Sequence, residues 1–85
     1  MTPRNILLFG AGKSATVLID YLIDEAASGN WQVTVADANE NLALQKTGGR
    51  PYSRALGIDI NNTAKRQTLI RESDIVISKI GRAHV

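Results

Sequence analysis

Three small residues, Gly10, Gly12 and Ala15, follow an apolar run with the spacing Gly-x-Gly-x-x-Ala. The run, residues 6–9, is typical of a buried strand, and the residues after the turn are typical of a helix. A helix N-terminus presents free backbone N–H groups and a positive dipole end, which favour a phosphate group. Gly10 permits the tight turn, Gly12 lets backbone approach a pyrophosphate, and Ala15 lets the helix pack closely on the strand. The pattern therefore predicts a dinucleotide site.

A carboxylate stands where such a site needs one. Asp37 ends the second apolar run, residues 31–37. In dinucleotide-binding folds an acid at the tip of the second strand accepts hydrogen bonds from the adenosine ribose hydroxyls. Because a 2′-phosphate there would meet a like charge, Asp37 favours NAD over NADP as the cofactor. The alternative interpretation is that Asp37 is a turn residue or helix cap ahead of Asn39 and Glu40.

A second phosphate-binding motif is a near miss. Gly12, Lys13 and Ser14 look like the end of a P-loop, Gly-x-x-x-x-Gly-Lys-Ser, which binds nucleoside triphosphates. That motif needs a glycine five residues before Gly12, and position 7 is leucine. The loop is too short to wrap a triphosphate, so we expect Lys13 to be a solvated side chain at the mouth of the turn.

Composition excludes several other functions. The chain has 85 residues, a net charge of +2 and ten scattered Lys and Arg, so it gives no electrostatic case for binding nucleic acid or a membrane surface. It has no cysteine, and its one histidine is His84, so neither a thiolate metal site nor a histidine-based triad can form. No signal peptide or membrane span is visible, and we expect a cytoplasmic protein.

Four short apolar runs alternate with three helical patterns. We expect strands over residues 6–9, 33–36, 55–60 and 75–77, and helices over residues 13–27, 39–46 and 63–71. Crossovers of this length permit only parallel pairing, and right-handed crossovers give the strand order 3-2-1-4. The predicted fold class is α/β, a Rossmann-like parallel sheet with helices on both faces. It is incomplete, because a full dinucleotide-binding domain has two such halves.

The apolar spacing also predicts which side chains face the core. Val17, Leu18, Tyr21 and Leu22 recur at three- and four-residue spacing in the first helix, and Tyr21 and Trp31 are expected to pack between helix and sheet. In the later helices the residues expected to point inward are Leu42, Ala43, Leu69 and Ile70.

Asp59 and Ile60 end the third predicted strand, beside the expected adenine end of the groove. Asp59 would hydrogen-bond the adenine amino group, and Ile60 would pack on the ring. The alternative, of equal weight, is that Asp59 is a loop carboxylate that caps the following helix.

Once these residues are placed, four stretches suggest a family: residues 6–23 (ILLFGAGKSATVLIDYLI), 33–39 (VTVADAN), 55–60 (ALGIDI) and 74–78 (DIVIS). The chain resembles the N-terminal cofactor domain of the saccharopine dehydrogenase family, in its saccharopine reductase-like branch. Such proteins are oxidoreductases that interconvert an imine and a secondary amine with a nicotinamide cofactor. In lysine metabolism the amine joins glutamate to a semialdehyde derived from aminoadipate.

The resemblance implies a set of cofactor contacts and partners. The pyrophosphate would be held by Gly10, Gly12, Lys13, Ser14 and Ala15, the adenosine ribose by Asp37, the adenine by Asp59 and Ile60, and the nicotinamide ribose would lie near Ser78. The implied partners are NAD and, in the full-length protein, a small amino-acid substrate, and a homo-oligomer is left open. The family's catalytic residues would lie beyond residue 85, so none is assigned, and we expect this chain alone to be inactive.

The end of the chain does not continue the pattern. Residues 80–85 (IGRAHV) match one reading frame of a common sequencing-adapter oligonucleotide, ATC GGA AGA GCA CAC GTC, and its preceding bases AG account for Lys79. We therefore expect residues 1–79 to contain the dinucleotide-binding half-domain, a fragment, and residues 80–85 to be a non-native tail. The alternative is a genuine short tail of a stand-alone module.

Two other functions share these features. A regulatory NAD-binding module, similar to those that gate potassium transport, has the same glycine turn and the same acid after the second strand. A remnant that folds poorly and binds nothing tightly is the third interpretation, because the predicted strand 75–77 is apolar and would lie at an unprotected sheet edge.

Overall fold

The chain forms an all-parallel, four-stranded sheet with helices on both faces. The computed structural model describes residues 3–59 and 61–78. Its elements are β1 (Arg4–Phe9), a 3₁₀ turn η1 (Lys13–Ala15), α1 (Thr16–Asp24), α2 (Ala26–Gly29), β2 (Trp31–Asp37), α3 (Glu40–Thr47), β3 (Ser53–Gly57), α4 (Thr63–Arg71) and β4 (Ile75–Ser78). The strand order is β3-β2-β1-β4, which confirms the predicted α/β, Rossmann-like arrangement. The predicted tail, residues 80–85, and Ile60 lie outside the described residues.

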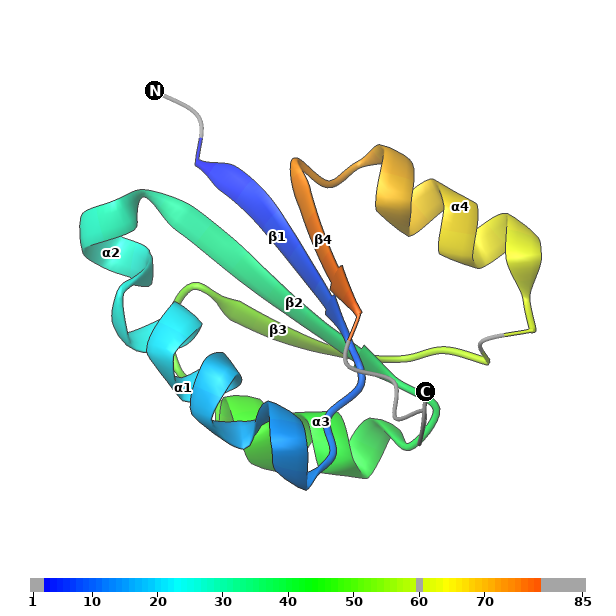
Figure 1. Ribbon diagram of the computed structural model, residues 1–85, viewed down its shortest axis with the longest axis horizontal. Coiled ribbons are helices and arrows are strands. Elements are labelled where there is room, and N and C mark those ends of the chain that lie inside the picture. Colours follow the sequence, from blue (N-terminus) through cyan, green and yellow to red (C-terminus); the bar gives the residue numbers. More distant parts are fainter. Residues whose placement is uncertain (1–2, 60, 79–85) are drawn as a thin grey trace.

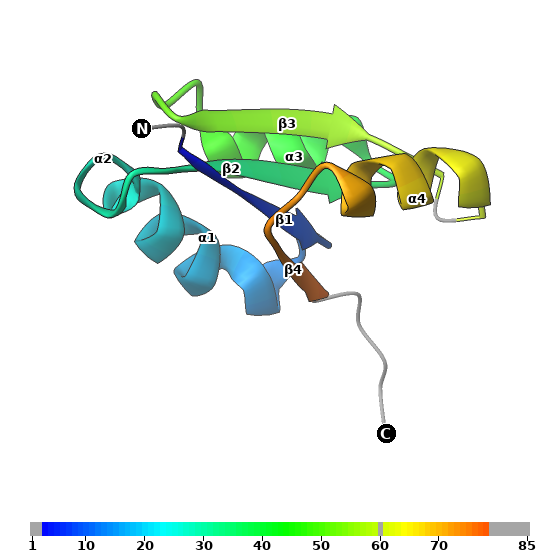
Figure 2. The ribbon, with the colours of Figure 1, turned by 90° about the horizontal axis from the view of Figure 1, so that it is seen from above.

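The two faces of the sheet are covered unequally. α1 and α3 lie on one side and α4 on the other (Figure 1 and Figure 2). Ile6 and Leu8 of β1 point to the α1–α3 side and join its larger core, whereas Leu7 and Phe9 point to the α4 side. All four of these side chains are at most 4% exposed. A central strand that is apolar on both faces is typical of a parallel sheet, as the sequence predicted.

The first helix differs from its prediction in both extent and facing. It breaks at Glu25, and the left-handed residue that ends α2 is Asn30, with a φ of 58°. Val17 and Tyr21, predicted to face the core, are 81% and 59% exposed, so that prediction was wrong. The other two predicted positions are confirmed, because Leu22 is buried and Leu18 packs against the core. The helix also buries Ala15, Ile19, Ile23 and Ala26. Trp31 does pack against this core, as predicted.

The third strand lies earlier than predicted. β3 pairs with β2 from Ser53, opposite Val33, to Gly57, opposite Asp37, so Asp59 lies beyond the strand. The loop before it holds Gly48, Gly49 and Tyr52 at positive φ, and this turn sets where pairing begins. The predicted bounds, residues 55–60, were too late in the chain. They were chosen from apolar content, whereas the turn determines the register of the strand.

The later helices agree better with the sequence. α4 has the predicted bounds, and α3 begins one residue after its Asn39 cap. Ala43 is buried and Leu42 packs against the core, as predicted. In α4, Leu69 is buried, but Ile70 is 41% exposed, which corrects its predicted inward position. Part of α4 extends beyond the carboxyl ends of the strands (Figure 2), and Leu69 is its one buried side chain.

Candidate functional site

The glycine turn lies where β1 ends and the first helix begins. Gly10 has a φ of 102°, which a side chain would disfavour, and its N–H donates to the Ala36 oxygen at 2.7 Å. The Ala15 N–H donates to the Gly12 oxygen at 3.0 Å and closes the 3₁₀ turn. Ala15 is fully buried, so the turn is pressed against the sheet. These bonds fix the backbone of the turn without any ligand.

The outer side of the turn is open. A Cβ built on Gly12 would have no atom within 4 Å. No acceptor in residues 3–59 and 61–78 receives the N–H groups of Gly12, Lys13 or Ser14. These three exposed residues lead into α1, so their N–H groups stand at the positive end of a helix. Free donors beside open space meet the requirement of a bound pyrophosphate.

Asp37 is tied directly to this turn. Its Oδ2 accepts the N–H of Ala11 at 2.7 Å, and its Oδ1 accepts the N–H of Asn39 at 2.8 Å. The side chain is half-buried. An ionised carboxylate offers about four lone-pair sites, so each oxygen retains capacity for a further donor. Asp37 is thus the turn residue of the alternative interpretation. Its carboxylate can also accept further hydrogen bonds next to the glycine turn.

The sequence did not reveal that the N–H groups of Ala11 and Asn39 hold the Asp37 carboxylate in place. The Asn39 side chain caps α3 by accepting the Leu42 N–H at 3.2 Å, while its own N–H holds Asp37. An Asn two residues after a strand-ending Asp, just before a helix, is the sequence signal that could have revealed this arrangement. It fixes the loop between β2 and α3 around the carboxylate.

The remaining predicted residues lie along the same edge of the sheet. Ser78 ends β4 and pairs with Phe9, the last residue of β1. Asp59 is exposed, and its Oδ1 accepts the N–H of Asn61 at 2.9 Å. The cap of α4 is Asn62, which accepts the Lys65 N–H, so Asp59 shapes the turn before the helix and does not cap it. Ile60 lies outside the described residues, and the buried apolar residue of this loop is Ile58.

Other kinds of site find no support in the described part of the chain. Among these residues no group of three or more His, Cys, Asp or Glu side chains could hold a metal ion. None of the helices described is long and apolar enough to cross a membrane. A comparison of the chain with protein-family models and with curated proteins finds no match in either.

Proposed function

We propose that the glycine turn and Asp37 bind the pyrophosphate and the adenosine ribose of NAD. The observation that carries this proposal is the group of three free N–H donors beside the open space at Gly12, with the Asp37 carboxylate hydrogen-bonded to the neighbouring Ala11. Lys13 and Ser14 contribute backbone N–H groups, and Ala15 packs beneath them. A ribose with free 2′- and 3′-hydroxyls can donate to Asp37, whereas a 2′-phosphate would be repelled by it.

We further propose that the chain supplies this cofactor to an oxidoreductase similar to saccharopine dehydrogenases. The support is the resemblance of residues 6–23, 33–39, 55–60 and 74–78 to that family. The nicotinamide supplies the hydride chemistry. In this chain the contribution is to hold the dinucleotide, with Ser78 nearest the nicotinamide side and the Asp59 loop nearest the adenine side. The substrate is then an amino-acid-derived secondary amine.

The test is to fill the open space at Gly12. A valine at this position has room in the folded chain, because its Cβ meets nothing within 4 Å and the φ of Gly12 is −74°. The branched side chain would occupy the space of the pyrophosphate. We expect Gly12→Val to keep its thermal unfolding midpoint and to lose at least about tenfold in NAD affinity, measured by saturation-transfer NMR, which corresponds to ~1.4 kcal/mol.

The control is Ala27→Val, which places the same isopropyl side chain at an exposed position of α2, away from the turn. It should leave NAD affinity unchanged. Equal affinity in wild type and Gly12→Val would refute the pyrophosphate assignment.

A further inference from the structure

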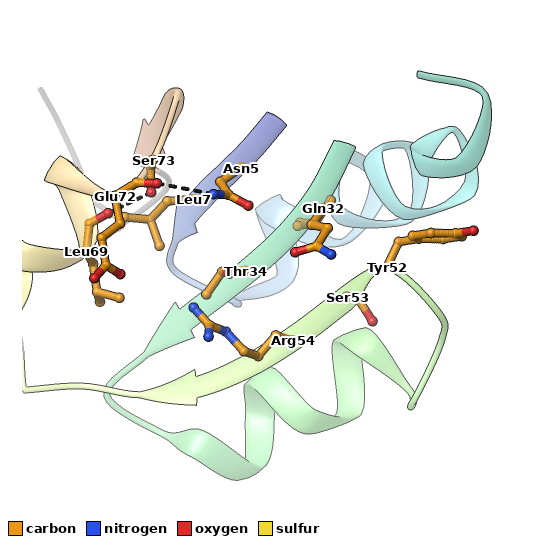
Figure 3. Close-up of a pocket in the computed structure, with 11 residues that line it drawn as sticks. Asn5, Leu7, Gln32, Thr34, Tyr52, Ser53, Arg54, Leu69, Glu72 and Ser73 are labelled. Carbon is orange, nitrogen blue, oxygen red and sulfur yellow. Dashed lines mark hydrogen bonds between the residues drawn. The ribbon is translucent and has the colours of Figure 1, made fainter. Parts of the chain in front are cut away.

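A hollow of about 500 Å³ lies on the α4 face of the sheet, over the amino-terminal part of the strands and away from the glycine turn. Asn5 of β1, Gln32 and Thr34 of β2, Arg54 of β3 and Glu72 at the end of α4 line it (Figure 3). Asn5, Gln32 and Arg54 each stand at the first or second residue of their strand, so this is the amino end of the sheet. Its volume is within the range of small-molecule sites.

The hollow exists because α4 covers only part of its face of the sheet. Leu69 packs with Phe9 and Ile58 and also lines the hollow, and on this face no described helix covers the amino-terminal part of the sheet (Figure 1 and Figure 2). The side chains that face this uncovered part are polar in β2 and β3, Thr34 and Arg54 among them. Parallel sheets are normally apolar on both faces, so polar residues here mark a surface that water or a polar ligand contacts.

Two opposite charges border the hollow. Figure 3 shows the Arg54 side chain extending across toward Thr34, with Glu72 on the α4 side of the same space. Within residues 3–59 and 61–78 neither charge takes part in an ion pair, since Arg50 makes both of the ion pairs that are present. Both residues are exposed. An ion pair between two exposed side chains contributes little to stability, so a ligand that carries both charges can compete with it.

The walls of the hollow are held in place. The Asn5 side-chain amide donates to the backbone carbonyl oxygen of Glu72 at 3.2 Å, and the Asn5 backbone N–H donates to the Asp74 carboxylate at 2.7 Å. These bonds join β1 to the chain between α4 and β4. At the other wall Tyr52 has a φ of 65°, and its oxygen accepts the Val33 N–H at 2.9 Å. A bulky residue in left-handed backbone is costly, and such positions gather at binding sites.

We propose that this hollow binds a free amino acid as its zwitterion. The carboxylate lies on the Arg54 guanidinium, whose planar fork matches it with two hydrogen bonds. The ammonium lies on Glu72, and the ligand side chain contacts Gln32 and Thr34. The proposal does not depend on NAD binding, because the glycine turn lies at the other end of the sheet.

The experiment titrates the ¹⁵N-labelled chain with L-glutamine, a zwitterion with a polar side chain, and follows the backbone amide signals. We expect saturable shifts at Thr34, Arg54 and Ser73 and none at Gly12. Arg54→Gln and Glu72→Gln should each weaken glutamine binding at least about tenfold. The control variants are Lys65→Gln and Glu25→Gln, which each remove one exposed charge outside the hollow, one of each sign. Both should leave the affinity for glutamine unchanged.

Two results would overturn the proposal. One is the absence of a saturable shift in the hollow at any glutamine concentration. The other is equal binding of acetate or of methylammonium alone, which would show a simple ion site. If Arg54→Gln loses the dispersed spectrum of a folded chain, Arg54→Lys keeps the charge without the planar fork. That variant should fold and bind glutamine more weakly than wild type, and wild-type affinity there would contradict the guanidinium contact.

Discussion

At the scale of residues, Asp37 connects the two halves of the candidate site. Its two oxygens hold the glycine turn through Ala11 and the next loop through Asn39. Bonds of backbone N–H groups to a carboxylate are stronger than neutral ones, so the carboxylate fixes both loops before a ligand arrives. A ligand that binds fixed loops loses less conformational entropy on binding.

A substitution at Asp37 tests its contribution to the stability of the chain in the absence of any ligand. We expect Asp37→Asn to lower the free energy of unfolding by about 1–3 kcal/mol, because the amide NH₂ would face one of the two N–H groups. The measurement is urea denaturation followed by the fluorescence of Trp31, the only tryptophan. Asp24→Asn is the control, since the Asp24 carboxylate is exposed and lies 3.6 Å from Arg50; its effect should stay within about 0.5 kcal/mol. Equal effects of the two substitutions would contradict the conclusion that the Asp37 carboxylate fixes the two loops.

The residues of the turn could be predicted from sequence because their types are restricted. Gly10 needs its left-handed φ, and Gly12 leaves the space that a side chain would fill. The bond between Asp37 and Ala11 could not be predicted, because it joins residues 26 positions apart and depends on the register of β1 against β2. Side-chain types indicate a site, but their hydrogen bonds follow from the packing.

At the scale of elements, α1 shows what a helical pattern leaves open. Its sequence contains two overlapping apolar stripes, one through Val17 and Tyr21 and one through Ile19 and Ile23. Burial of Ala15 against the sheet decides between them, because it fixes the rotation of the helix that follows. The tight turn sets this rotation, and periodicity alone carries no information about it.

The corner between α2 and β2 gives a test at this scale. A Cβ on Gly29 would lie 2.0 Å from the Trp31 ring, and the Trp31 indole N–H donates to the Leu22 oxygen at 2.7 Å. We expect Gly29→Ala to displace the ring and to lower the free energy of unfolding by about 1–3 kcal/mol.

In a Trp31→Ala background the same Gly29→Ala change should be neutral or should raise stability, by up to about 1 kcal/mol, because alanine favours the helix. Denaturation followed by circular dichroism measures all four chains of this cycle. A destabilisation of equal size in both backgrounds would contradict the close packing of Trp31 on Gly29.

At the scale of the whole molecule, the parallel sheet gathers the candidate residues at one edge. The carboxyl ends of β1, β2 and β4 bring together the glycine turn, Asp37 and Ser78, although up to 68 positions separate them in the chain. Ligands of α/β sheets bind outside these ends. The strand order could be predicted because handed crossovers permit few arrangements. The hollow at the amino end could not, because it depends on how far α4 extends over the sheet.

The central claim is that NAD binds at the glycine turn and Asp37. The most direct measurement is a titration of the ¹⁵N-labelled chain with NAD and, separately, with NADP, following every backbone amide. We predict saturable shifts at residues 10–15 and 37–39 with NAD, weak shifts with NADP at the same concentrations, and none in the hollow around Arg54. The claim would be contradicted if these amides did not respond to NAD, or if NADP bound as tightly as NAD.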